Sequence, residues 1–229
     1  IDKFGNTIEV FSTAEEKEKE AFWQSYSFRF QIGTQWLVYF FVEAIRAGKL
    51  SFESVEQFLL DRWIGEEFIE NYNSVEVSVR PYDLIRPAIR SLFQKAQGWI
   101  LEGEKQPDWV METDSLVLKA EALLRYMCRR IGISTFKPRK SKEGNAHNLV
   151  MEKNLDEILA DLQHRQDVNE TYFEEDDRLF IKYVFTGKFG QNLRNRSAHG
   201  LLDYNEYAFE NLLTIFTAIM RLAKYDFNK

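Results

Sequence analysis

Residues 190–201 read GQNLRNRSAHGL, a polar stretch between two apolar segments with helical periodicity. The stretch carries Arg194, Asn195 and His199. A packed core rarely contains so many charged and hydrogen-bonding side chains in a row. We therefore interpret it as the chemical centre of the chain and the apolar segments around it as the scaffold.

Helical geometry predicts how the side chains of this stretch are arranged. We expect a short helix from about residue 192 that ends at Gly200, because glycine readily adopts the left-handed backbone of a helix end. Arg194 and His199 are five residues apart, so they lie roughly 140° apart around the axis. A permanently charged planar donor beside a group that titrates near neutrality suits a phosphodiester. The alternative on spacing alone is a histidine at a helix end beside a surface arginine.

The composition is that of a folded protein. Of the 229 residues, 45% are hydrophobic and 15% aromatic, which is enough for a substantial core. The single Cys128 excludes a disulfide within the chain and indicates a reducing compartment, so we expect a cytoplasmic protein. The longest aromatic-aliphatic run, residues 36–42, is far shorter than the roughly 20 residues that cross a bilayer, so we expect no membrane association. The chain begins with Ile1 rather than Met, which leaves room for upstream domains or a regulatory partner.

Charge is distributed unevenly along the chain, whose net charge is −6. Residues 1–113 contain 12 basic and 19 acidic side chains, whereas residues 114–229 contain 18 and 17. A polyanion would therefore be bound by a local basic patch in the second part rather than by an overall positive field.

Periodicity and turn residues predict an all-α protein in two parts, with the boundary in the Gly- and Pro-containing segment 103–108. We expect an accessory helical region over residues 1–113 and a second helical domain over residues 114–229. Residues 75–79 alternate between apolar and polar side chains over a span that allows an edge strand at best. Asp114 is expected to cap one of the helices. The expected helices are 13–47, 52–64, 82–101, 115–131, 154–162, 178–185 and 204–225.

The first expected helix is unusually aromatic. One interpretation is a core-facing helix, and the other is a base-stacking platform or a partner interface. The aromatic residues are Phe22, Trp23, Tyr26, Phe28, Phe30, Trp36, Tyr39, Phe40 and Phe41.

Two charged segments have a functional and an ordinary interpretation. Residues 133–149 form a long polar connection with Lys137, Arg139 and Lys140, which is either a solvated loop or an RNA-backbone contact. Residues 174–177 are four consecutive acids that precede an expected helix. Negative charge is stabilised by the dipole at a helix N-terminus, so we prefer this interpretation to a metal site. The three histidines are far apart, and no zinc-binding spacing exists. We expect no metal and no cofactor.

The segment LRNRSAHG resembles the Arg-x4-6-His signature of HEPN domains, in which a polar residue commonly follows the arginine and glycine often follows the histidine. Arg194, Asn195, His199 and Gly200 occupy these positions. The segments KAEALLRYMCRRIGIST, MEKNLDEILADL and FTGKFGQNLRNRSAHGLL are similar to an uncharacterised bacterial branch of this superfamily, usually found at the C-terminal end of larger proteins. The resemblance covers roughly residues 114–227.

The resemblance implies a helical bundle of HEPN type and a metal-independent endoribonuclease, often in a toxin or antiphage defence system. Such enzymes are usually homodimers with a composite active site that acts on RNA. The family then implies that His199 transfers a proton, Arg194 stabilises the charged phosphorane, and Asn195 orients the histidine or the phosphate. Arg196 is a second phosphate contact. Glu121 either supports the site, by pairing with Arg194 or biasing His199, or is a surface charge.

Two further hypotheses remain. The chain is a non-catalytic HEPN-like module that binds RNA or a nucleotide, or only dimerises. Alternatively it is a structural helical domain in which Arg194 and His199 pair with acidic residues between subunits.

Overall fold

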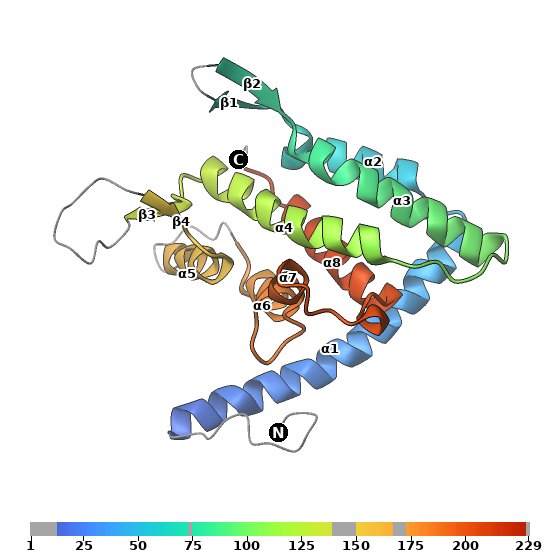
Figure 1. The fold of residues 1–229 in the computed structure, drawn as a ribbon, viewed down its shortest axis with the longest axis horizontal. Helices are drawn as coiled ribbons and strands as arrows, with labels where there is room; N and C mark the ends of the chain where they lie inside the picture. The colour runs from blue at the N-terminus through green and yellow to red at the C-terminus, as the bar shows by residue number, and fades with distance from the viewer. Residues whose placement is uncertain (1–12, 73–74, 139–149, 167–172, 228–229) are drawn as a thin grey trace.

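The computed structural model describes residues 13–72, 75–138, 150–166 and 173–227. Helices dominate these residues, which confirms the all-α class, and two short antiparallel hairpins project from the helices (Figure 1). The α-helices are α1 (Ala14–Arg46), α2 (Phe52–Leu60), α3 (Pro81–Leu101), α4 (Val110–Arg130), α5 (Leu155–Gln166), α6 (Glu175–Phe185), α7 (Leu193–Ala198) and α8 (Phe209–Ala223). Two short 3-10 helices are η1 (Trp63–Gly65) and η2 (Tyr204–Glu206).

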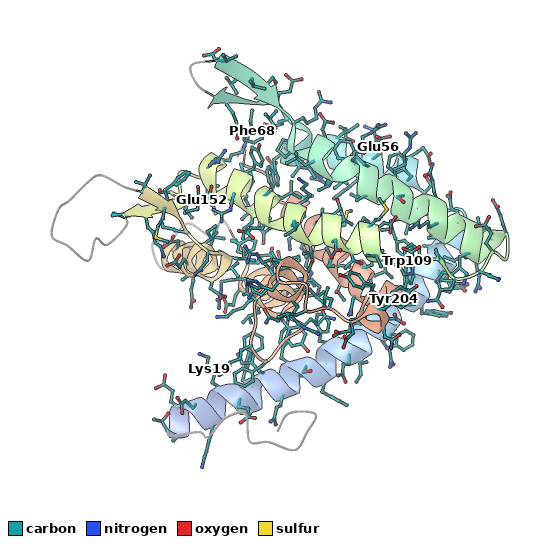
Figure 2. The ribbon with its side chains drawn as sticks, in the orientation of Figure 1. Lys19, Glu56, Phe68, Trp109, Glu152 and Tyr204 are labelled. Atoms are coloured by element: carbon teal, nitrogen blue, oxygen red, sulfur yellow. The ribbon has the colours of Figure 1, made fainter. Side chains whose placement is uncertain are left out.

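The hairpins account for the parts of the chain that lack helical periodicity. The first pairs β1 (Phe68–Tyr72) with β2 (Val75–Val79), so the expected edge strand exists and its partner precedes it. The second pairs β3 (Phe136–Pro138) with β4 (Val150–Glu152), within a segment that we expected to be a loop. The ring of Phe68, labelled in Figure 2, lies 5.6 Å from that of Tyr126 and joins the first hairpin to α4.

The helices α3, α4 and α8 form the centre of the fold (Figure 1). One continuous apolar core runs from the C-terminal part of α1 to α8. Phe41 of α1 lies 5.5 Å from the ring of Phe93 and 5.6 Å from that of Phe209, and Trp63 donates from Nε1 to the carbonyl oxygen of Leu222 over 2.8 Å. Residues on both sides of position 113 therefore share a core. The expected boundary segment 103–108 lies between α3 and α4, and the division at residues 113 and 114 falls inside α4.

Helix α6, expected from residue 178, begins at Glu175, so three of the four consecutive acids lie inside it. Two other helix starts that differ from the expectation lie beside α7. Helix α4 begins at Val110, so Asp114 lies inside the helix and does not cap it. Helix α8 begins at Phe209 because residues 204–206 form a 3-10 turn, whose capping box joins Asp203 and Glu206. Both differences place carboxylates beside α7. In the described parts of the chain, no helix combines the length and the apolar character needed to cross a membrane.

Candidate functional site

The central stretch forms the short helix α7, and its backbone explains the glycines and Asn192. Asn192 precedes the helix with φ of 51°, a left-handed conformation that asparagine tolerates better than most residues. A Cβ atom on Gly190 would lie 2.1 Å from the carbonyl oxygen of Tyr183, so only glycine lets this loop approach the end of α6. Gly200 follows the helix with φ of 65°, and the next residue, Leu201, donates from its backbone nitrogen to the carbonyl oxygen of Arg196 over 2.8 Å. This helix end was predicted from the sequence.

Arg194 is held from the neighbouring helix α4. Its Nε donates to Oε2 of Glu121 over 2.7 Å, so the pairing inferred for Glu121 is present. Oε1 of the same carboxylate accepts from Arg125 over 2.7 Å, and Arg125 also donates to the carbonyl oxygen of Lys153. The Glu121 side chain is 11% exposed and that of Arg194 is 29% exposed. The guanidinium is therefore fixed at one edge by a largely buried carboxylate and remains accessible at another.

Asn195 completes the support of Arg194. Its Oδ1 accepts from Nη1 of Arg194 over 3.0 Å, and its Nδ2 donates to Oδ1 of Asn192 over 2.8 Å. Nη2 of Arg194 makes no hydrogen bond to any residue that the structure describes. In this arrangement Asn195 orients the arginine, and one guanidinium nitrogen remains available as a donor.

Arg196, inferred to be a second phosphate contact, has a bidentate partner. Both terminal nitrogens donate to the carboxylate of Glu206, and Nη2 also donates to the carbonyl oxygen of Leu201 over 3.2 Å. The hydrogen bonds from Arg196 hold the pKa of Glu206 below its usual value, and those to Glu206 raise the pKa of Arg196. The pair fastens α7 to the turn that precedes α8.

A third carboxylate fixes the other face of α7. Asp114 accepts from the hydroxyl of Ser197 over 2.7 Å and from that of Tyr207 over 3.2 Å. Burial and the neighbouring Asp114 raise the pKa of Tyr207. Glu121 and Asp114 both project from α4, so one helix positions two side chains of the short helix.

His199 differs from its neighbours because its imidazole has no hydrogen bond or ion pair with any described residue. The residue lies at the C-terminal end of α7 and is exposed, and its backbone nitrogen donates to the carbonyl oxygen of Asn195 over 3.2 Å. The exposed imidazole is therefore open to a ligand as well as to solvent.

The predicted basic contacts of residues 133–149 are not assembled with α7. Lys137 lies on β3 and forms an ion pair with Glu157 of α5. In Figure 1, β3 lies beyond α5 and well separated from α7. Arg139 and Lys140 lie outside the described residues. The contacts therefore join Arg194, Asn195 and Glu121, and His199 lies at the end of the same short helix.

Among the consecutive acids at residues 174–177, Glu174, Glu175 and Asp177 have positively charged partners. Asp177 is fully buried and binds Arg221 over 2.6 Å and Lys224 over 2.8 Å, which joins α6 to α8. Glu174 also binds Lys224, and Glu175 binds Arg178. Over the described ranges, no three His, Cys, Asp or Glu side chains are arranged to hold a metal ion.

Four supporting residues were missed in the sequence, among them Glu206, which lies within the expected closing helix and binds Arg196. Asp114 was expected to cap its helix, Tyr207 was expected inside the closing helix, and Asn192 was counted only as a helix start. The positive φ of Asn192 has a sequence signal, since asparagine between glycine-rich and helical segments favours the left-handed region. The contacts of Asp114 depend on how α4 and α7 pack, which the local sequence does not encode. Comparisons of the chain with protein-family models, curated proteins and solved structures give no match.

Proposed function

We propose that the protein is a metal-independent endoribonuclease of HEPN type, a cytoplasmic homodimer of a bacterial toxin or antiphage defence system. The observation that carries the proposal is the exposed imidazole of His199, without a partner among the described residues, at the end of the helix that presents Arg194. Glu121 and Asn195 hold two nitrogens of that guanidinium and leave Nη2 for a ligand. A fixed cation and a free acid–base group on one exposed turn suit phosphodiester chemistry.

The reaction is an internal transesterification of RNA. The 2′-oxygen forms a bond to the adjacent phosphorus, and the bond from phosphorus to the 5′-oxygen breaks. His199 takes the proton of the 2′-hydroxyl, and in a composite site the partner subunit's His199 gives a proton to the leaving 5′-oxygen. The products carry a 2′,3′-cyclic phosphate and a 5′-hydroxyl. The proton lost by the 2′-hydroxyl is matched by the one that the 5′-oxygen gains, and no oxidation or reduction occurs.

Arg194 stabilises the negative charge that accumulates on the non-bridging oxygens. A donor aimed at such charge typically contributes about 10²–10³ in rate, and a positioned acid or base about 10²–10⁴. These contributions are sufficient for a modest nuclease. Because Glu121 is held in turn by Arg125, the guanidinium need not reorganise when RNA binds.

The test is incubation of the purified chain with mixed tRNA and structured RNA in EDTA, followed by analysis of the fragment ends. We expect fragments with 2′,3′-cyclic phosphate and 5′-hydroxyl ends. Cleavage that requires a divalent ion, or fragments with 5′-phosphate ends, would contradict the proposal.

A second candidate is a non-catalytic HEPN-like module that binds RNA or a nucleotide. The ion pairs favour it, since Glu121 and Glu206 already neutralise Arg194 and Arg196. This candidate predicts binding without cleavage, with an affinity that falls as salt rises. Filter binding at several salt concentrations, on RNA that remains intact, distinguishes it from the nuclease.

A further inference from the structure

Helix α1 has two apolar faces, and the helices described here cover one of them. Trp23, Phe41 and Ile45 are its buried residues. On the opposite side lies the outer face of α1, whose side chains are Phe28 (66% exposed), Ile32 (43%), Trp36 (56%), Tyr39 (54%) and Phe40 (61%). Phe22 is a sixth exposed apolar residue of α1, nearer its N-terminus (47%). Single exposed apolar residues are normal, but six on one helix are not.

Helical geometry confirms that the five residues of the outer face form one surface. At about 100° per residue they fall within an arc of roughly 120°, centred opposite the arc of the buried residues. The N-terminal part of α1, where Lys19 is labelled, extends beyond the other helices (Figure 2). A helix that is apolar on opposite sides is stable when both sides are covered.

The area of the outer face is suited to a specific interface. Large aromatic and aliphatic side chains contribute about 200 Å² each, so the exposed fractions amount to roughly 550 Å². A standard protein interface buries about 800 Å² per partner, part of it a polar rim. The polar residues Gln31 and Gln35 flank the face and are exposed.

The spacing of the outer face is self-complementary. Phe28, Ile32, Trp36 and Phe40 recur every four residues, so the pattern reads the same in both directions. An antiparallel copy related by a two-fold axis near residue 34 places Phe28 against Phe40 and Ile32 against Trp36. Ridges with four-residue spacing in both helices favour a crossing angle of about −50°.

Charge also permits this pairing. Arg29 is the single charged residue between positions 25 and 42. The two copies of Arg29 are then ten helical positions apart, about 15 Å along the axis, so they repel each other weakly.

The aromatic end of the face is ordered within one chain. The ring of Trp36 lies 5.8 Å from that of Phe40 and 6.0 Å from that of Tyr39, and the Tyr39 and Phe40 rings are 5.5 Å apart. Tryptophan and tyrosine are the residues that most often dominate binding energy in interfaces. Because these rings already contact one another, little side-chain freedom is lost on association.

We propose that the outer face of α1 binds a second copy of this chain as an antiparallel helix pair. This inference rests on the homodimer of the proposed function and names α1 as the surface through which the two chains associate. Its test is association alone, so it can fail while RNA cleavage is observed and hold where none is.

The test is sedimentation equilibrium of the full chain, with Trp36→Glu as the variant. Interfaces of standard size, about 1,600 Å² in total, have micromolar or tighter affinity. With a polar rim around its apolar centre the α1 pair approaches that size, so at about 50 µM the unmutated chain is expected at twice its 27.2 kDa mass. Glutamate keeps the helix propensity but places a charge in the contact, and dimer affinity should fall at least about 100-fold. The matched control is Met111→Glu, a 76% exposed apolar residue on α4, which should dimerise normally. Equal thermal melting of the three proteins shows that the fold is kept.

A monomeric unmutated chain at that concentration, or a Trp36→Glu protein that dimerises as well as the Met111→Glu control, would overturn the proposal. Oxidative cross-linking tests the orientation. Ile32→Cys protein mixed with Trp36→Cys protein should form a covalent dimer, whereas neither variant alone should. Cross-linking of Ile32→Cys protein with itself would overturn the antiparallel arrangement.

Discussion

Replacement of Glu121 by glutamine removes the carboxylate that both Arg194 and Arg125 contact. Hydrogen bonds to charged groups contribute about 1.5–3 kcal/mol each, and the glutamine oxygen can keep one of the two. Because the Glu121 side chain is 11% exposed and Arg194 29% exposed, solvent screens the lost bond only in part. We therefore expect Glu121→Gln to lower the free energy of unfolding by about 2 kcal/mol. For a chain of this length that corresponds to a fall in Tm of about 4–8 °C.

The assay is thermal unfolding followed by circular dichroism, with Glu43→Gln as the matched control. Glu43 forms an ion pair with Arg46 in which both side chains are well exposed, 45% and 57%. Such pairs contribute little, so the control should lose less than about 0.5 kcal/mol. If the Glu121→Gln protein has the same Tm as the Glu43→Gln control, the inference that Glu121 fixes Arg194 is refuted.

Two further predictions concern the scaffold of the site. Burial alone would raise the pKa of Asp177, but hydrogen bonds from Lys224 and its other partners outweigh burial and keep the pKa below its usual value. This contribution is present above the unfolded-state pKa of about 4 and is lost as pH falls through the folded-state value. Urea unfolding should therefore show Asp177→Asn to be about 3–5 kcal/mol less stable at pH 7, with a smaller difference below about pH 4. A difference in stability that stays constant with pH would contradict this. Gly190→Ala should destabilise by about 2 kcal/mol or more, because its Cβ meets Tyr183, whereas Gly33→Ala, in the middle of α1 with open space around its Cβ, should stabilise by about 0.5–1 kcal/mol. Opposite shifts in Tm are expected, and shifts of the same sign would contradict the reasoning.

The sequence predicted the elements that depend on local patterns. The helical periodicity of residues 115–131 and the stop at Gly200 follow from spacing and residue type. The pairing of Glu121 with Arg194 was one of three alternatives for Glu121, and the packing of α4 against α7 selects it. The contacts around α7 could not be predicted from the sequence. Asp114 and Glu206 lie on other elements, and they contact α7 only because those elements pack beside it. Arg196 illustrates this, since only the fold shows that Glu206 binds it on both terminal nitrogens.

The aromatic helix shows a different limit. Its periodicity favoured a core-facing helix, and Phe41 and Ile45 do lie in the core. Trp36 and Phe40 are equally apolar but lie on the far side of the same helix, more than half exposed. The sequence shows that both faces of the helix are apolar. Which of the two is buried depends on how the other helices pack against it.

The most direct test of the central claim is the rate constant of RNA cleavage in EDTA for three proteins: unmutated, His199→Ala and Leu201→Ala. Leu201 is 63% exposed and lies two residues beyond His199, so its truncation removes a comparable surface side chain without a titratable group. We predict that His199→Ala lowers the rate constant about 10²–10⁴-fold and that Leu201→Ala changes it less than about twofold. Cleavage by His199→Ala at the unmutated rate, with all three proteins equally folded, would contradict the assignment of the chemistry to α7.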